Sequence, residues 1–423
     1  MTMFCPAKFC ILLFAVKFAS GLEFEEFIRW KQVAYESIPD ASYLTPDFVF
    51  PEYAAVPGDD SYIPYNNVPQ GVNHYKGRLF ITMPRRSPGV PSTLNYIDLK
   101  QTKAGDSPRL KSYPNAEINS LRSTLKPGQK RLISVYRTRL DPCHRLWFVD
   151  TGMLEYPNNR TQVQRPSIWI MNLLTDEVIS RYEVPESIVV EGRGLVSITP
   201  DITKGKCDEA YGYIPDLVQP ALHVYSLKDN RMWTFRHNYF YFDPQSGDYN
   251  IAGQQFQWRD GIFSITLGDE NKEGFRDAYF HPLSSTSEFA VSTKVLRNET
   301  NARRPHQGED FKLLGARGKD MESSVHVYDP HTKVLFYAQI ALSGIGCWNT
   351  QKRFASQNHH LIHQNLQTMI YPSDITVDMD GTLWAMTNSM PVFIYSKLDT
   401  NQYNFRVWRQ EAGKAIQGTG CAL

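Results

Sequence analysis

The chain has 423 residues, with 45 Lys and Arg against 44 Asp and Glu, so its formal net charge is +1. That balance gives no reason to expect nucleic acid or a membrane surface as a partner. Hydrophobic residues make up 42% of the chain, and its 26 glycines and 26 prolines are spread along it. This composition favours many short strands and turns over long helices.

Residues 1–21 resemble a secretory signal peptide. Lys8 precedes an apolar run, and small residues close the segment. The run is too short to span a bilayer, so we expect export of a mature chain, residues 22–423, as one secreted domain. Two Asn-X-Thr sequons, at Asn159 and Asn298, are typical of an exported glycoprotein.

The mature chain contains four cysteines, Cys143, Cys207, Cys347 and Cys421. Four cysteines allow three pairings, of which the sequential one is the simplest. A zinc site with four cysteine ligands is the rival interpretation, but the chain contains no C-x-x-C. We therefore expect two disulfides, no metal and no cofactor.

A weak repeat runs along the chain. The stretches Lys76–Thr82, Cys143–Val149 and Asp380–Met386 share one register, and shorter echoes bring the count to six units spaced about 50–70 residues apart. Repetition in fixed order at this scale predicts an all-β fold, a six-bladed β-propeller with four-stranded antiparallel blades. We expect one domain, because no linker is visible.

The last unit, residues 372–409, predicts four strands in meander order. These strands are expected at 373–378, 383–386, 392–395 and 403–408, with a tight turn at Asp380-Gly381. The N-terminal stretch 24–35 is an edge-strand candidate. Residues 299–320 and 351–370 are interpreted as polar insertions between blades.

The repeat register also predicts which residues line the mouth of the propeller channel. The residue that follows each central apolar run is expected there: Pro84, Thr151, Asp216, Leu283, Ile340 and Asn388. Polar candidates next to these positions are Arg85, Asp150, Gln339, Ser373 and Asp374. This mixed lining suits a small organic ligand better than a phosphate.

Several longer motifs resemble those of the yellow / major royal jelly protein family of insects. They are WKQV from Trp30, PRRSPGVPSTL from Pro84, DPCHRLWFVDTG from Asp141, DGIFSITL from Asp260, GCWNT from Gly346 and YPSDITVD from Tyr371. The C-terminal AIQGTGC from Ala415 also fits. The likeness covers nearly the whole mature chain.

The resemblance implies a secreted six-bladed propeller with sequential disulfides and a role in cuticle or eggshell pigmentation and hardening. It also implies that some members act on dopachrome and that salivary members bind biogenic amines. In the amine pocket, Asn388 matches the polar residue that contacts the ligand in the family. Ser373 replaces the family's threonine and keeps its hydroxyl group. Ser92 and Met390 stand where amine binders carry rings, which removes stacking and cation–π contacts.

Three aspartates are candidate proton carriers at the mouth: Asp374, Asp150 and Asp216. Thr151 is a further candidate ligand contact beside Asp150. The D-x-x-x-D-x-D-G stretch that begins at Asp374 is either a hard-cation site or a hairpin turn, and its spacing favours the turn. The HHLIH stretch, residues 359–363, is interpreted as a solvated loop rather than a zinc site.

Three functions remain open. The first is a secreted protein of the extracellular matrix of cuticle or eggshell that binds small catechol- or amine-derived ligands at the channel mouth. The second is a dopachrome-converting, tautomerase-type enzyme that uses the same mouth. The third is a biogenic-amine-binding protein, which Ser92 and Met390 disfavour.

Overall fold

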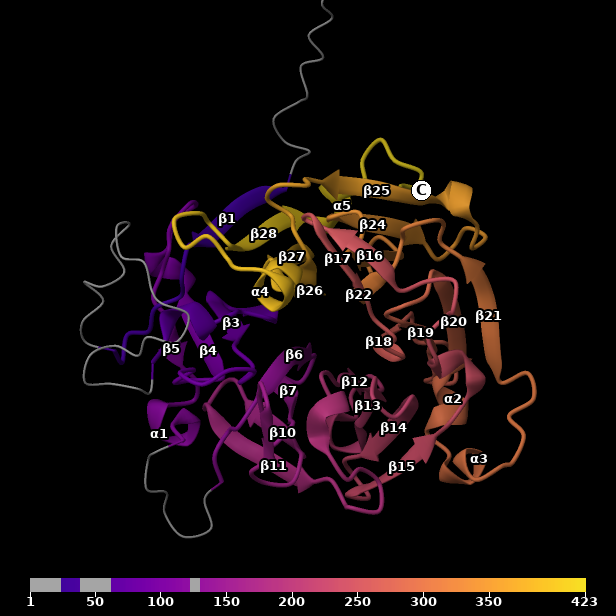
Figure 1. The fold of residues 1–423 in the computed structure, drawn as a ribbon. Coiled ribbons are helices and arrows are strands. Elements are labelled where there is room, and N and C mark those ends of the chain that lie inside the picture. The colour runs from indigo at the N-terminus through magenta and orange to yellow at the C-terminus, as the bar shows by residue number, and fades with distance from the viewer. Residues whose placement is uncertain (1–23, 39–61, 122–129) are drawn as a thin grey trace, which may run out of the picture.

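The computed structural model describes residues 24–38, 62–121 and 130–423. The predicted signal segment, residues 1–21, lies outside these ranges. Six four-stranded antiparallel sheets are arranged around a central axis (Figure 1). The predicted six-bladed propeller is confirmed.

Blades 1 to 3 each take four strands of one continuous stretch of chain, with the first strand innermost. Blade 1 consists of β2 (Val72–Tyr75), β3 (Arg78–Thr82), β4 (Leu94–Asp98) and β5 (Lys111–Ser112). Blade 2 consists of β6 (Val135–Asp141), β7 (Arg145–Asp150), β10 (Ser167–Asn172) and β11 (Glu177–Glu183). Blade 3 consists of β12 (Thr199–Asp201), β13 (Tyr211–Asp216), β14 (Ala221–Ser226) and β15 (Arg231–Phe235).

Blades 4 and 5 repeat this order. Blade 4 consists of β18 (Ile262–Leu267), β19 (Asp277–Pro282), β20 (Ser287–Ser292) and β21 (Phe311–Ala316). Blade 5 consists of β22 (Ser323–Asp329), β23 (Val334–Gln339), β24 (Gly344–Asn349) and β25 (His359–Gln364).

Blade 6 joins the two ends of the chain. It consists of β26 (Pro372–Val377), β27 (Thr382–Thr387), β28 (Phe405–Glu411) and the N-terminal strand β1 (Glu25–Trp30). Strand β1 pairs antiparallel with β28, and the ion pairs Glu25–Arg409 and Glu26–Arg406 each measure 2.7 Å. The edge strand predicted at 24–35 is therefore confirmed as the outer strand that closes the ring.

Three details of the sequence interpretation are wrong. Residues 392–395 belong to helix α4 (Met390–Tyr395) and not to a strand, because Pro391 opens a helical turn there. Residues 299–320 and 351–370 are not simple insertions, since they contain the outer strands β21 and β25. The HHLIH stretch is strand β25 itself, with His359 buried.

In the described residues, two short hairpins and four further α-helices lie outside the blades. The hairpins are β8 (Met153–Tyr156) with β9 (Asn159–Gln162), and β16 (Asp248–Ile251) with β17 (Gln254–Gln257). The helices are α1 (Ala116–Asn119), α2 (Thr293–Leu296), α3 (Glu299–Ala302) and α5 (Ala412–Ala415). No helix in the described ranges is long and apolar enough to cross a membrane.

The second strand of each blade forms the centre of the core. All six residues of β7 and all six of β23 are buried, as expected for strands packed on both faces. Short turns join the inner strand to the second strand in blades 1, 2, 5 and 6, whereas longer loops do so in blades 3 and 4. Between β2 and β3, Lys76 and Gly77 have φ angles of 45° and 80°, and these left-handed conformations match the twist of a two-residue hairpin.

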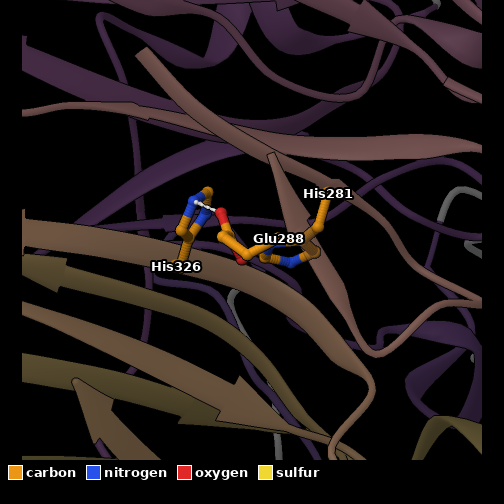
Figure 2. A group of neighbouring side chains, drawn as sticks. All are labelled: His281, Glu288 and His326. Atoms are coloured by element: carbon orange, nitrogen blue, oxygen red, sulfur yellow. Dashed lines mark hydrogen bonds and ion pairs between the residues drawn. The ribbon is translucent and has the colours of Figure 1, made fainter. Parts of the chain in front are cut away.

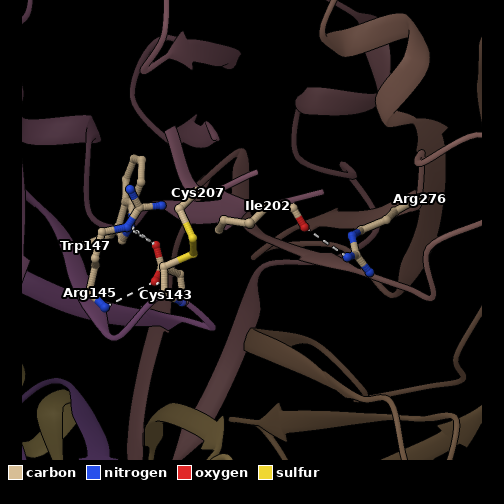
Figure 3. Close-up of a disulfide and its surroundings, with 7 residues drawn as sticks. Cys143, Arg145, Trp147, Ile202, Cys207 and Arg276 are labelled. Atoms are coloured by element: carbon tan, nitrogen blue, oxygen red, sulfur yellow. Dashed lines mark hydrogen bonds and ion pairs between the residues drawn. A yellow bond between two sulfur atoms is a disulfide. The ribbon is translucent and has the colours of Figure 1, made fainter. Parts of the chain in front are cut away.

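The sequential disulfides are both present. Cys143 joins Cys207 with Cα atoms 6.1 Å apart, and so ties the β6–β7 turn of blade 2 to blade 3 (Figure 3). Beside this disulfide, the buried carboxylate of Asp141 accepts hydrogen bonds from Arg145 and Trp147. Cys347 joins Cys421 and ties the C-terminal segment to blade 5. Disulfides of this kind are typical of proteins that fold in an oxidising compartment.

Candidate functional site

The channel mouth lies on the face of the propeller where the second strands end and the inner strands begin. The loop after β3 meets the start of blade 2 there, because the Arg85 amide donates to Ser134 Oγ at 2.9 Å. On the other side, the Asn388 amide donates to the Pro69 carbonyl at 2.9 Å. The repeat register therefore brings the predicted mouth positions to one face of the propeller.

Asp374 lies on the inner strand β26 and is fully buried. Its carboxylate is 2.9 Å from Arg139 Nη2 and 3.6 Å from Arg137 Nε, and it accepts from the Val72 amide at 3.1 Å. Burial lowers the pKa of Arg137 to about 10, although Asp374 opposes that shift. This carboxylate therefore neutralises two arginines in the channel wall.

Asp150 ends the second strand of blade 2 and is also fully buried. It accepts hydrogen bonds of 2.8–3.0 Å from the amides of Ile133, Ser134 and Gly152 and from the Gln164 side chain. Burial raises its pKa, and these hydrogen bonds act in the opposite direction. All its partners belong to the protein, so Asp150 holds the loops of blade 2 together.

Asp216 occupies the equivalent position in blade 3. It accepts from the amides of Val218 and Gln219 at 3.0 and 2.9 Å, and its other oxygen is 3.5 Å from His223. Strand-end aspartates commonly bind turn amides in this way. For all three aspartates, the role of proton carrier stays a prediction.

The predicted ligand contacts are buried as well, and their polar groups are bonded within the protein. Ser373 donates to the Gln70 carbonyl at 2.8 Å, Ser92 to the Leu94 carbonyl at 3.2 Å, and Thr151 to the Ser134 carbonyl at 3.2 Å. Met390 differs from these, because its sulfur accepts a 3.2 Å contact from Arg86. Ligand binding by these residues also stays a prediction.

The D-x-x-x-D-x-D-G stretch forms a hairpin turn, as its spacing indicates. Asp378 accepts from the amides of Asp380 and Thr382 at 3.0 and 2.9 Å. Its second oxygen contacts Trp384 Nε1 at 2.8 Å and His74 Nδ1 at 2.7 Å. These contacts leave Asp378 a structural role.

A group of charged and phenolic side chains at the mouth was missed by the sequence interpretation. We call it the mouth cluster, and it consists of Arg86, Tyr136, Glu155, Arg193, Asp260 and Tyr371. Tyr136 donates a hydrogen bond to Glu155, whose other oxygen is 3.8 Å from Arg193. Arg86 interacts electrostatically with Tyr136, Glu155, Tyr371 and Asp260. Tyr136 lies on the inner strand β6 and Glu155 on the hairpin strand β8, whereas the other four members lie in segments outside the blade strands.

Asp260 is the member of the mouth cluster whose carboxylate is available to react. It stands just before the inner strand β18, and its carboxylate makes no hydrogen bond or ion pair with the described residues. Burial raises its pKa, while Arg193 and Arg86 act in the opposite direction. Burial also raises the pKa of Tyr371 to about 12 and keeps Tyr136 protonated. The mouth cluster therefore combines two carboxyl groups, two phenols and two arginines.

A separate cavity of about 300 Å³ lies further along the channel, among the inner strands. Its lining includes Asn73, Arg139, Thr199, His326 and Thr376, from inner strands of five blades. Arg139 already pairs with Asp374. The lining also contains apolar side chains such as Leu140, Ile265 and Val377, so this part of the channel is mixed in polarity.

The two sequons lie at the surface. Asn159 opens strand β9 and is exposed. Asn298 is exposed as well, and its side chain caps helix α3 by accepting from the Thr300 amide at 3.0 Å. Occupancy of both sites stays a prediction.

The sequence profile described as "Major royal jelly protein" matches residues 133–421. The chain belongs to the major royal jelly protein family. A family relative, "L-dopachrome tautomerase yellow-f" of Drosophila melanogaster, is 50% identical over 412 residues, which cover 95% of each chain. "Protein yellow" of Drosophila subobscura is 36% identical over 399 residues, which cover 93% of this chain and 68% of the relative.

Similarity to solved structures is weaker. A virginiamycin B lyase from Staphylococcus aureus aligns with a TM-score of 0.42 at 11% identity, covering 82% of this chain and 95% of the lyase. That likeness carries no functional argument. Membership of the major royal jelly protein family confirms the resemblance drawn from the sequence motifs.

Proposed function

We propose that the protein is a secreted tautomerase that converts dopachrome-type quinones at the channel mouth, in cuticle or eggshell pigmentation and hardening. The observation that carries this proposal is the 50% identity, over 95% of both chains, to an L-dopachrome tautomerase. This identity supports the enzyme over the matrix-binding role, which the sequence interpretation put first. Two disulfides support export, together with the signal expected at residues 1–21.

The reaction asks for acid–base groups and no redox partner. Conversion of dopachrome to its dihydroxyindole isomer moves protons from the saturated ring carbons to the two quinone oxygens, and no electrons leave the molecule. A positioned base must take the carbon-bound protons, and a donor must supply protons to the oxygens. The mouth cluster contains both kinds of group.

Asp260 is the base in this proposal. Its carboxylate makes no hydrogen bond or ion pair with the described residues, and burial raises its pKa, so it accepts a proton more readily than an ordinary aspartate. Tyr371 and Tyr136 are protonated at neutral pH and can donate toward developing phenolate oxygens. Arg86 and Arg193 supply positive charge for the carboxylate of the substrate.

Stopped-flow absorbance of freshly prepared dopachrome tests the proposal with the secreted, disulfide-intact protein. We expect saturable acceleration by the wild type and a loss of about 10²- to 10⁴-fold for Asp260→Asn, the range that general acid–base catalysis supplies. Asp248→Asn, which removes an exposed carboxylate in hairpin β16–β17, is the matched control and should keep the wild-type rate.

Two outcomes would contradict the proposal at different points. A wild-type rate equal to that of heat-denatured protein would refute the proposal that the protein is an enzyme. Catechol binding without turnover would then favour the matrix role. If Asp260→Asn retained the wild-type rate, the protein would still be an enzyme, but Asp260 would not be its general base.

A further inference from the structure

A buried cluster of three metal-ligating side chains spans blades 4 and 5. His281 lies on β19, Glu288 on β20 and His326 on the inner strand β22 (Figure 2). All three are essentially inaccessible to solvent, and one ligand atom of each lies within 4.8 Å of the others. We propose that these residues bind one divalent ion of the zinc class and so join blade 4 to blade 5.

The spacing of the donor atoms fits such an ion. His281 Nδ1 lies 3.0 Å from Glu288 Oε2, and His326 Nε2 lies 3.1 Å from Glu288 Oε1. Ligands about 2.1 Å from a tetrahedral zinc ion stand about 3.4 Å from one another, so a small movement of the side chains admits the ion. Two histidines with one glutamate are a familiar zinc ligand set.

Proton placement at His281 gives the first independent argument. Its Nε2 lies 3.1 Å from the Ser323 carbonyl oxygen, which only accepts, so this nitrogen carries the proton of a neutral ring. Nδ1 then faces Glu288 Oε2 at 3.0 Å, and two acceptors meet without a proton. A metal ion at Nδ1 removes the conflict.

Unpartnered polar atoms give the second argument. Glu288 Oε1 and His326 Nε2 are buried and meet no hydrogen-bond geometry with the described residues; at 3.1 Å from each other they form an ion pair only when His326 is protonated. The hydroxyl of Tyr337, whose ring stacks 5.6 Å from that of His326, is buried and unpartnered as well. Buried polar groups without partners are costly, and a bound ion would satisfy the first two.

The outer partners that hold metal ligands in place are already present. The Ser323 carbonyl fixes His281, Ser264 Oγ lies 2.7 Å from His326 Nδ1, and Arg317 holds the second oxygen of Glu288. Such contacts orient the ligands and set the histidine tautomers. His326 also lines the 300 Å³ cavity of the channel, which offers the ion a path of entry.

Metal analysis of the intact secreted protein tests the inference. We expect elemental mass spectrometry to find about one zinc-class ion per chain. Protein stripped by a chelator should bind Zn²⁺ with the same stoichiometry in calorimetry. Co²⁺ bound in its place should give the visible absorption of a tetrahedral site with nitrogen and oxygen ligands. A folded wild type that contains no ion and binds neither Zn²⁺ nor Co²⁺ saturably would overturn the inference.

Three variants assign the ligands. Glu288→Gln and His326→Asn should lose more than the roughly 10- to 100-fold in affinity that removal of an outer partner costs. His223→Asn is the matched control, because His223 is equally buried beside Asp216 but has no third ligand group, and it should keep the ion. Wild-type affinity in a folded Glu288→Gln or His326→Asn variant would refute this ligand set. If neither variant folds, the wild-type stoichiometry and the Co²⁺ spectrum decide.

Discussion

Replacement of Asp374 by asparagine distinguishes a structural from a catalytic role for the carboxylate that the sequence made most prominent. The substitution keeps the shape of the side chain and removes its charge. Arg137 and Arg139 then lose the negative partner that lies 3.6 and 2.9 Å away. The hydrogen bond from the Val72 amide can still form to the asparagine oxygen.

The expected cost follows from burial. Asp374 and Arg137 are both essentially inaccessible, whereas the Arg139 side chain is 14% exposed and can regain some hydration. Removal of one partner of a buried ion pair typically costs about 3–5 kcal/mol. We expect Asp374→Asn to fall in this range, because at least one arginine charge remains buried without compensation. Nη1 of Arg137 already has no partner among the described residues.

Urea unfolding, monitored by fluorescence and by circular dichroism, measures this loss. Asp380→Asn is the control, since Asp380 is exposed in the neighbouring hairpin turn and should change stability by less than about 0.5 kcal/mol. Stability of Asp374→Asn within that same margin would refute the structural argument. If dopachrome turnover were lost in such a stable variant, Asp374 would be the proton carrier that the sequence predicted.

Three further predictions follow from the described contacts. Serine at both Cys347 and Cys421 should lower the free energy of unfolding by about 4 kcal/mol in the chain-entropy model, because the disulfide closes a 74-residue separation; chemical denaturation checks this. Burial raises the pKa of Asp260, so the folded state loses stability as pH rises from the unfolded pKa through the folded one. Asp260→Asn should therefore unfold at a higher temperature than the wild type at neutral pH, and its turnover should lack the acid limb of the wild-type profile. Gly194→Ala should cost about 1–3 kcal/mol in urea unfolding, because the added Cβ would stand 1.9 Å from Asp216 Oδ1.

The number of blades could be predicted because each blade carries its own short sequence pattern, which does not depend on distant residues. Most second strands contain a short apolar run followed by a polar residue or proline, and this pattern is clear in blades as different as those around Leu146 and Leu335. The N-terminal edge strand was predictable only as a candidate, because its partner β28 lies some 380 residues away.

Where local pattern is ambiguous, the prediction failed. The apolar run at residues 390–395 is compatible with a buried strand and with a helical turn. Its contacts with the rest of the fold determine which of the two forms. The three histidines of β25 suggested a solvated loop, although outer strands of a propeller tolerate polar residues on their open face.

The candidate sites depend on distant residues. His281, Glu288 and His326 carry no spacing that indicates metal binding, since they meet only when blades 4 and 5 pack. Asp260 appeared only as the first residue of a family motif, and nothing nearby indicates that Arg86 and Arg193 face it. A single sequence can place such residues at a strand end, but it cannot show which side chains converge.

The closure of blade 6 by β1 also constrains how the molecule is made. Strand β1 leaves the ribosome some 380 residues before its partner β28 is synthesised. Throughout synthesis and export, β1 must therefore stay unpaired without joining another sheet edge. Such a distant pairing is intrinsically slow to form. Yield in a secretory host should consequently depend on the chaperones that protect this N-terminal strand, and a bulky tag placed directly before Phe24 should trap the ring in an open state.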